Sequence, residues 1–339
     1  MTNFSGVSTN LLLGLAIALA SLLVLEIVLR VFFGFGKPPI YVADSEIGYL
    51  LAPNQRTRRF GNRIAINQYS MRSPPIAPER PASTLRVLML GDSIVNGGWW
   101  TDQAGTISEL LRTQLTDAVA SPADLTRPFQ QVEVLNASAN SWAPRNELAY
   151  LQRLGSFEAQ AILLVINTDD LFGDKPTPKP VGRDRNYPHR YPFLTLALAE
   201  IFSRYLLPRL PLLAPPPYEP PPREPGNPVD RNLEAIGEIA AYACQQNAQF
   251  LLAMTPLLRE VGSPGPLDYE IEARQQLQTF TQAEAIDYID FLPQFNAEKQ
   301  PELLYRDHIH LSPKGNAMVS NALGKSLLSL QWRQTTPPS

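Results

Sequence analysis

The sequence predicts an α/β fold in which helices cover both faces of a mainly parallel sheet, preceded by one N-terminal transmembrane helix. Two patterns lead to this prediction. From Arg86 onward, short apolar segments typical of buried strands alternate with segments of helical periodicity. Near the N-terminus, residues 11–33 are almost wholly apolar, and about 23 residues at roughly 1.5 Å each suffice to cross a hydrocarbon core of about 30 Å.

Composition shifts divide the 339-residue chain into an N-terminal anchor (residues 1–36), a small β appendage with a linker (residues 37–82) and a main domain (residues 83–333) that contains a proline-rich insert (residues 174–230). In the main domain we expect strands at residues 86–90, 131–135, 161–166, 250–254 and 285–289, and helices at residues 108–118, 145–154, 232–246, 271–281 and 314–330. Because the strands do not alternate polar with apolar residues, the sheet is expected to be buried on both faces.

The N-terminal apolar run contains only two charged residues, Glu26 and Arg30. They lie four residues apart on one helix face and near one end of the run, where they can pair or extend toward the membrane surface. A cleaved signal peptide is the main alternative, because Ala16-x-Ala18 and Ala18-x-Ala20 resemble cleavage sites. No Lys or Arg precedes the run, however, and it continues well past Ala20, so we expect an uncleaved single-pass anchor.

The side of the membrane is a separate question. Basic residues follow the span and none precedes it, and by the positive-inside rule this distribution assigns the main domain to the cytoplasm.

Two segments outside the alternating pattern have recognisable composition. Residues 56–60 and 63–67 flank Gly61-Asn62, which is suited to a tight hairpin, and residues 74–81 form a proline-containing linker. In the insert, the proline density excludes a regular helix or central strand and favours extended geometry. Its apolar residues 193–213 are interpreted as a surface segment whose short helix packs on the core; a membrane-lying or substrate-shaping element is the alternative, given the helical spacing of Leu194, Leu198, Ile201 and Tyr205.

Two short motifs at opposite ends of the main domain are suited to nucleophilic catalysis. Ser93 follows the first expected strand, and Asp307 lies three residues before His310 near the C-terminus. A serine hydroxyl is a poor nucleophile at neutral pH unless an imidazole takes its proton and a carboxylate holds the imidazole. Ser93, Ser141 and Asp169 each come just after an expected strand, and parallel strands bring such positions to one edge of the sheet. The sequence therefore predicts a serine-dependent site in one crevice.

Composition argues against several other classes. The formal net charge of −3 provides no basic footprint for nucleic acid, and the single cysteine, Cys244, excludes an internal disulfide. The chain has no P-loop and no strand-following Gly-x-Gly-x-x-Gly, and no Gly-x-Ser-x-Gly surrounds Ser93. His308 and His310 are two residues apart, but no further histidine cluster supports a metal site. No cofactor is expected.

Four blocks of sequence resemble the GDSL/SGNH hydrolases, specifically the bacterial membrane-anchored kind. The resemblance extends from about Tyr41 onward, apart from the insert. The first block is Gly91-Asp92-Ser93-Ile94-Val95-Asn96-Gly97, and the last runs from Asp307-His308-Ile309-His310 to Gly315. The second block is Asn136-Ala137-Ser138-Ala139-Asn140-Ser141, in which Ser141 occupies the usual glycine. In the third block, Asn167-Thr168-Asp169-Asp170-Leu171, Asp169 stands where the family has asparagine.

The resemblance implies a three-layer α/β/α flavodoxin-like sandwich and a serine esterase or deacylase with Ser93, His310 and Asp307 as its catalytic residues. The substrate would be an O-acyl ester of a glycan or lipid of the cell envelope, and members of this group usually face the periplasm or exterior, the side expected here. The backbone N–H groups of Ser93 and Ser141 would bind the oxyanion. An ionised Asp169 would repel it, unless Asp169 is protonated in a desolvated pocket or Asn167 supplies the amide instead. An O-acyltransferase using the same serine, and a catalytically weakened binding or assembly module, are the alternative functions.

Overall fold

The computed structural model describes residues 4–120, 129–210, 216 and 218–330. The outer residues of the expected anchor, the last three residues of the insert's apolar segment (211–213) and the end of the expected main domain (331–333) lie outside this description. At the centre is a five-stranded sheet of β5 (Thr84–Gly91), β6 (Gln131–Ser138), β7 (Ala161–Asn167), β8 (Gln249–Thr255) and β9 (Asp287–Asp290). Its order is β6-β5-β7-β8-β9 and all neighbours are parallel. This is the flavodoxin-like order, as predicted.

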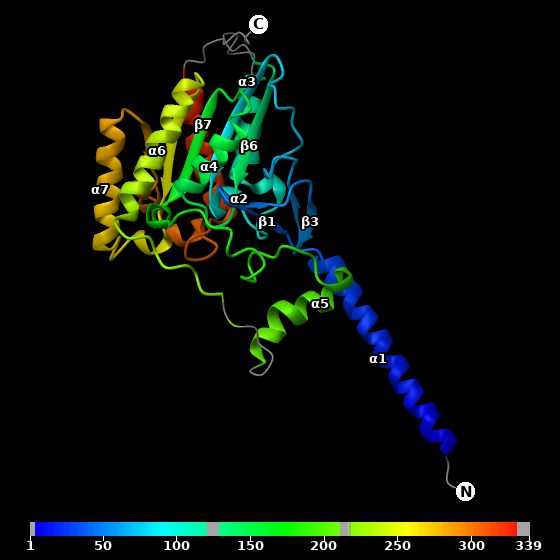
Figure 1. Ribbon diagram of the computed structural model, residues 1–339. Helices are drawn as coiled ribbons and strands as arrows, with labels where there is room; N and C mark the ends of the chain where they lie inside the picture. Colours follow the sequence, from blue (N-terminus) through cyan, green and yellow to red (C-terminus); the bar gives the residue numbers. More distant parts are fainter. Residues whose placement is uncertain (1–3, 121–128, 211–215, 217, 331–339) are drawn as a thin grey trace.

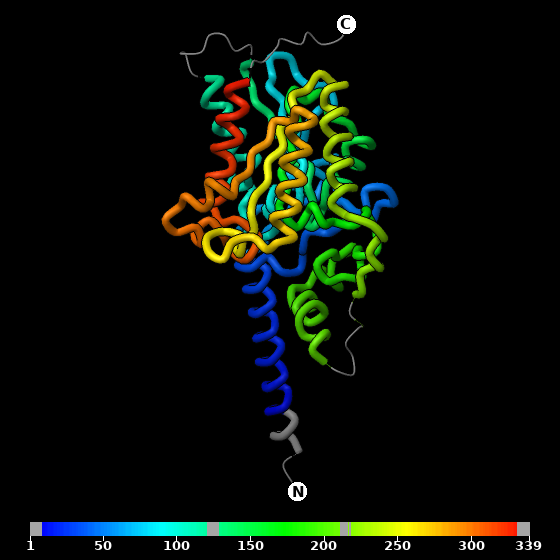
Figure 2. The backbone as a smooth tube through the Cα atoms, turned by 90° about the vertical axis from the view of Figure 1, so that its left-hand side faces the viewer, coloured from blue at the N-terminus to red at the C-terminus, as the bar shows by residue number. Residues whose placement is uncertain are grey.

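Helices cover both faces of the sheet (Figures 1 and 2). One face carries α3 (Ile107–Val119) and α9 (Pro313–Ser329); the other carries α4 (Pro144–Leu154), α6 (Pro228–Gln245) and α7 (Asp268–Ala283). Alternate residues of β5 point into the two apolar clusters, and every residue of β5 and β7 is buried. The predicted three-layer sandwich is confirmed, and its burial on both faces explains the strands' continuous apolar sequence.

The last strand begins two residues later than predicted. Ala285 has a φ of +52° and the Ile286 N–H returns to the Thr281 carbonyl, so these residues end α7. The backbone becomes extended only at Asp287. The apolar residues at 285 and 286 satisfied a strand pattern, but they serve as a helix C-terminal turn.

The β appendage consists of two hairpins, β1 (Tyr41–Asp44) with β2 (Gly48–Leu51) and β3 (Arg56–Arg59) with β4 (Asn62–Ala65). Arg59 pairs with Asn62, so the second turn consists of Phe60-Gly61 and not of Gly61-Asn62 as predicted. Both turn residues have positive φ, which matches the right-handed twist of the paired strands. Appendage side chains join the apolar cluster on the α4 face of the sheet.

The N-terminal helix α1 (Phe4–Phe33) projects from the main domain in both views (Figures 1 and 2). Residues Thr9–Phe33 form the one helix in the described part of the chain that is long and apolar enough to cross a membrane; a signal sequence would have the same properties. Of the two arrangements expected for Glu26 and Arg30, the structure shows the ion pair, with 2.7 Å between Arg30 Nη2 and Glu26 Oε1.

The insert departs from its expected packing. Its helix α5 (Ala197–Ile201), extended by helical turns at Phe202–Leu206 and Leu207–Arg209, lies against the C-terminal end of α1 and not on the core. Glu26 accepts hydrogen bonds from the N–H groups of Ala197 and Leu198, both at 2.9 Å. The only acidic side chain of the apolar helix thus supplies the N-terminal cap that the sequence of α5 lacks, which gives a physical reason for α5 to lie against α1.

Candidate active site

The candidate nucleophile, Ser93, lies at the point where the order of the strands in the sheet reverses. β5 has β6 on one side and β7 on the other, so Ser93 follows the strand at the topological switch point, where open α/β sheets bind ligands. The last residue of β5 is Gly91. A larger residue would not fit there, because its Cβ would lie 2.6 Å from the Val165 carbonyl oxygen. Asp92 then caps the short helix α2 (Ser93–Asn96), accepting the Ile94 N–H at 2.8 Å.

The structure brings the predicted histidine and aspartate to this serine. The distance from His310 Nε2 to Ser93 Oγ is 3.0 Å, and His310 Nδ1 lies 2.9 Å from Asp307 Oδ2. Asp307 also accepts the N–H groups of Ile309 and His310, which makes the Asp-x-x-His spacing a compact hydrogen-bonded turn. Burial raises the pKa of Asp307, but these hydrogen bonds outweigh it and hold the pKa at about 2. An ionised carboxylate therefore faces the imidazole at any ordinary pH.

Two further side chains contact the triad, and neither contact was predicted from the sequence. The ring of Trp100 lies 4.2 Å from that of His310, centroid to centroid, and the Arg306 guanidinium donates to Asp307 Oδ2 at 2.9 Å. The same guanidinium lies over the rings of Trp99 and Trp100, at 5.0 and 4.8 Å. Adjacency to the motifs was the only sequence signal for these residues. His308, by contrast, points to solvent with 86% of its side chain exposed.

The turn that contains Ser141 is held in a strained conformation. Ser141 has a φ of +57°, in the left-handed region that favours glycine, and its N–H makes no hydrogen bond to any described residue. Tyr187 of the insert donates its hydroxyl to Ser141 Oγ at 3.0 Å, and Tyr49 of the appendage donates to the Asn140 carbonyl at 2.8 Å. A backbone donor is therefore left free, in a turn that the insert and the appendage fix. Trp142, next in the chain, is buried in the core and does not line the cleft.

Asn167 and Asp169 occupy different environments. The Asn167 side chain is buried and donates both of its amide hydrogens, to Asp92 Oδ2 at 3.0 Å and to Asp170 Oδ2 at 2.9 Å. It therefore has no hydrogen left to offer an oxyanion. Asp169 lies in no desolvated pocket: 55% of its side chain is exposed and its carboxylate is 3.9 Å from Arg259 Nη2. The desolvated carboxyl groups of this region are those of Asp170 and Asp92. Burial raises the pKa of Asp170 and, to a smaller extent, that of Asp92.

A buried arginine positions the loop that follows the nucleophile. Arg72 is fully buried and donates to the carbonyl oxygens of Asn96, Gly98 and Thr101, each at 2.6 Å. Burial lowers its pKa to about 10, so the guanidinium remains charged at neutral pH. This loop contains Trp99 and Trp100, and Arg72 thereby connects the appendage to the ring that packs on His310.

No group of three or more His, Cys, Asp or Glu side chains among the described residues has the geometry of a metal site. The site consists of a serine, an imidazole, a carboxylate and a free backbone N–H, an arrangement suited to acyl transfer through a covalent serine ester.

Comparison with protein families gives a match to the GDSL-like lipase/acylhydrolase family over residues 89–318, more than half of the chain and including Ser93, Asp307 and His310. The chain belongs to this family. GDSL-like lipases and acylhydrolases hydrolyse acyl esters, so family membership agrees with the geometry of the site.

Solved structures similar to this GDSL-like chain are distant in sequence. An acetyl xylan esterase is 15% identical, covers 71% of this chain and 99% of its own, and has a TM-score of 0.46. The lipase/acylhydrolase from Enterococcus faecalis is 13% identical over 71% of this chain and 94% of its own, with a TM-score of 0.42. A catalytic mutant of an acetylxylan esterase from Geobacillus stearothermophilus is 13% identical over 76% and 99%, with a TM-score of 0.45. Comparison with curated protein sequences gave no match.

Proposed function

We propose that this GDSL-like protein is a membrane-anchored serine esterase or deacylase that removes an O-acyl group from a glycan or lipid of the cell envelope. The observation that carries the proposal is the hydrogen-bonded series Ser93–His310–Asp307, with 3.0 Å between His310 Nε2 and Ser93 Oγ. Membership of a family of acyl-ester hydrolases supports the same chemistry. The proposed reaction uses no cofactor.

In the acylation step, Ser93 Oγ attacks the acyl carbonyl carbon while its proton passes to His310 Nε2. Asp307, ionised because of its low pKa, stabilises the imidazolium that forms. The carbonyl oxygen becomes an oxyanion, for which the backbone N–H groups of Ser93 and Ser141 are the proposed donors. Collapse of this intermediate breaks the ester C–O bond, and His310 returns the proton to the departing alcohol.

In the deacylation step, a water molecule takes the place of the alcohol. His310 accepts a proton from the water as its oxygen attacks the acyl-serine carbonyl, and then returns that proton to Ser93 Oγ as the acid product leaves. The carboxylic acid and the free enzyme are the final products.

Asp169 is proposed to attenuate this reaction. A carboxylate only accepts hydrogen bonds, so an ionised Asp169 offers no donor where the family has an amide. Loss of one oxyanion donor costs about 10²–10³ in rate. The amide of Asn167 offers no substitute, because both of its hydrogens are bonded elsewhere. These observations favour a slow esterase and also support a second candidate, a binding or assembly module that retains the fold with little activity.

The proposed anchor is α1, and the proposed location of the catalytic domain is the extracytoplasmic side. The helix's length and exposed apolar surface support the anchor. Protease accessibility in spheroplasts tests the side: cleavage of the main domain by added protease without lysis is expected, and protection would reverse the orientation.

The function is tested by labelling the full-length protein with a fluorophosphonate probe, which reacts only with an activated serine. We expect a stoichiometric adduct on Ser93 and none in Ser93→Ala. If the folded wild-type protein stays unlabelled, the esterase hypothesis is wrong and the binding or assembly module becomes the preferred function.

A further inference from the structure

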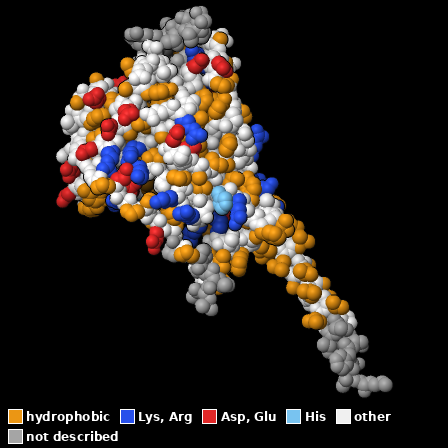
Figure 3. Space-filling model, in the orientation of Figure 1, with side chains coloured by type: hydrophobic (Ala, Val, Ile, Leu, Met, Phe, Trp, Pro, Cys, Tyr) orange, Lys and Arg blue, Asp and Glu red, His pale blue; other side chains and the backbone are white. Residues whose placement is uncertain are grey.

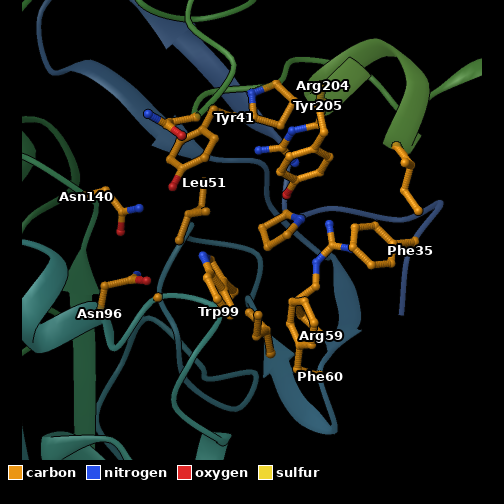
Figure 4. Close-up of a pocket in the computed structure, with 16 residues that line it drawn as sticks. Phe35, Tyr41, Leu51, Arg59, Phe60, Asn96, Trp99, Asn140, Arg204 and Tyr205 are labelled. Carbon is orange, nitrogen blue, oxygen red and sulfur yellow. The ribbon is translucent and has the colours of Figure 1, made fainter. Parts of the chain in front are cut away.

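A cavity of about 500 Å³ adjoins the proposed catalytic site and extends toward the end of α1 (Figure 4). At one side it is lined by Asn96, the last residue of the helix that begins with Ser93, and by Asn140, the neighbour of Ser141. Phe35, which follows α1, lines the opposite side with Arg59 and Arg204. Its volume is in the range of about 300–1,000 Å³ typical of ligand pockets.

Aromatic rings form a continuous series between the catalytic histidine and α1. From His310 the series runs through Trp100, Trp99, Phe60 and Phe35, with successive centroid distances of 4.2, 5.7, 5.1 and 5.8 Å. Three of these rings, those of Trp99, Phe60 and Phe35, line the cavity itself. Aromatic faces with nearby side-chain amides are suited to bind the ring of a sugar, whose C–H groups pack on the aromatic face while its hydroxyls bond to the amides.

The far side of the cavity has an excess of positive charge. Arg59 and Arg204 both pair with one carboxylate, that of Glu200. The Nε–H of Arg204 is buried and has no hydrogen-bond partner among the described residues. Arg204 also borders a second hollow, whose charged lining residues are four arginines (Arg183, Arg185, Arg190 and Arg204) and two acidic residues (Asp184 and Glu200). Arg183, Arg185 and Arg190 form no ion pair within the described part of the chain. Guanidinium groups so arranged are suited to phosphate oxygens.

Apolar surface surrounds this basic side. The insert exposes Phe193, Leu194, Phe202 and Leu206, each at least 49% exposed, on the side of the domain from which α1 projects (Figures 1 and 2). Figure 3 shows hydrophobic side chains along α1 and Lys and Arg side chains on the part of the domain near its end. A segment that lies in the membrane interface typically has apolar residues on the side toward the bilayer and basic residues on the side toward the lipid headgroups and water.

We propose that the cavity binds the head of an anionic membrane glycolipid, in which a phosphate separates an apolar tail from an acylated sugar. The tail would remain in the bilayer beside α1 and the insert, the phosphate would contact Arg204, and the sugar would lie on the aromatic series with its ester at Ser93. On the protein, the apolar surface is followed by the basic side of the cavity and then by its aromatic and amide residues. In such a lipid, the tail is followed by the phosphate and then by the sugar, in the same order. This inference rests on the proposed esterase function and names its substrate class.

The experiment measures binding without catalysis, using full-length Ser93→Ala in phosphatidylcholine nanodiscs and isothermal titration calorimetry. The probes are farnesyl diphosphate linked to N-acetylglucosamine, farnesyl diphosphate alone, an alkyl glucoside and inorganic phosphate. The sugar-linked diphosphate is expected to bind at least tenfold more tightly than each of the others. In Arg204→Met its affinity should fall about tenfold, while that of the alkyl glucoside should not change. Arg209→Met is the matched control, because Arg209 belongs to the same insert and lines neither hollow.

Equal binding of farnesyl diphosphate with and without the sugar would overturn the proposal in favour of a phospholipid. Equal losses in Arg204→Met and Arg209→Met would also overturn it, since general surface charge would then explain the affinity. Unchanged thermal unfolding of Arg204→Met excludes misfolding, and Arg204→Lys, which keeps the charge, should lose less affinity. Fluorophosphonate labelling of the parent protein tests the esterase function separately, because the binding measurements do not depend on a reactive serine.

Discussion

At the scale of single residues, the candidate site is built from local turns. The Asp307 carboxylate accepts the N–H groups of two residues in its own turn and still faces the His310 ring. A spacing of three residues is what allows one carboxylate to do both. Ser93 follows the strand at the switch point. The two local motifs therefore need only one tertiary contact, between Ser93 and His310, to form the triad.

We expect Ser93→Ala and His310→Ala each to abolish hydrolysis of a short acyl ester, because nucleophile and base act as one unit. His308→Ala should retain most of the activity, since that side chain is exposed and its Nδ1 is 4.0 Å from Asp307 Oδ1. Initial rates of p-nitrophenyl acetate hydrolysis measure all three. An inactive His308→Ala beside an active His310→Ala would reverse the assignment.

Asp169→Asn should raise the rate of ester hydrolysis, by up to about 10²–10³ if the wild-type site entirely lacks the amide donor. Because Asp169 is exposed, the substitution leaves the core intact, so the effect should appear in kcat without a change in thermal stability. Asp174→Asn, outside the motif in the same acidic stretch, is the control. No gain from Asp169→Asn at any pH would mean that the carboxylate does not approach the oxyanion.

At the scale of elements, the appendage and insert are part of the site's support. Tyr49 of β2 and Tyr187 of the insert hold the Ser141 turn, and Arg72 holds the loop after α2. The core sandwich positions Ser93, while these added elements fix the Ser141 turn and the loop that contains Trp99 and Trp100. Changes in them should therefore alter the site without breaking the sheet.

Arg72→Met should lower both the thermal unfolding temperature and the esterase kcat, because three buried carbonyl oxygens lose their donor at about 1–3 kcal/mol each. Arg56→Met, at an exposed position of the same appendage, should change neither quantity. Differential scanning fluorimetry and initial rates give the comparison. Wild-type kcat in a destabilised Arg72→Met would show that the loop does not support the site.

Glu26→Ala should loosen the insert, because the first N–H groups of α5 lose their cap. We expect faster proteolytic cleavage within the described insert residues, measured by limited proteolysis and mass spectrometry. Ser21→Ala on the same helix is the control, since that hydroxyl bonds only to the Ile17 carbonyl within α1. Equal cleavage rates in both variants would indicate that α5 does not depend on α1.

At the scale of the whole molecule, α1 and the insert lie on one side of the main domain (Figures 1 and 2). Residues that follow α1 and residues of the insert line the cavity, among them Phe35 and Arg204. An anchor attached at this side would hold the cavity near the membrane surface. The proposed catalytic serine would then meet substrates that are themselves held in the membrane, which reduces the search to two dimensions.

The full-length protein should sediment with membranes and resist extraction by salt or carbonate, because a spanning helix inserts almost irreversibly. A chain that begins at Tyr41 should be recovered in the soluble fraction. Mass spectrometry of the N-terminus supplies the decisive measurement: a soluble product that begins just after Ala20 would replace the anchor with a cleaved signal peptide.

The sequence by itself determined the sandwich, because burial on both faces leaves a continuous apolar signature in strands such as β5 and β7. It also determined Ser93, Asp307 and His310 as candidates, because each motif is a local turn with its own hydrogen bonds. It missed the contacts that join segments far apart in the chain, such as Glu26 with α5 and Arg72 with the loop after α2.

Only the tertiary structure decided which polar groups are already occupied. Asn167 has the chemistry of an oxyanion donor, but Asp92 and Asp170 take both of its hydrogens, while Asp169 points to solvent. The sequence likewise contained no sign of the cavity between Asn96 and Phe35, since its walls come from the appendage, the loop after α2 and the insert. A sequence pattern indicates whether a residue is buried or caps a helix. Which distant group forms a hydrogen bond with a polar side chain depends on how the elements pack.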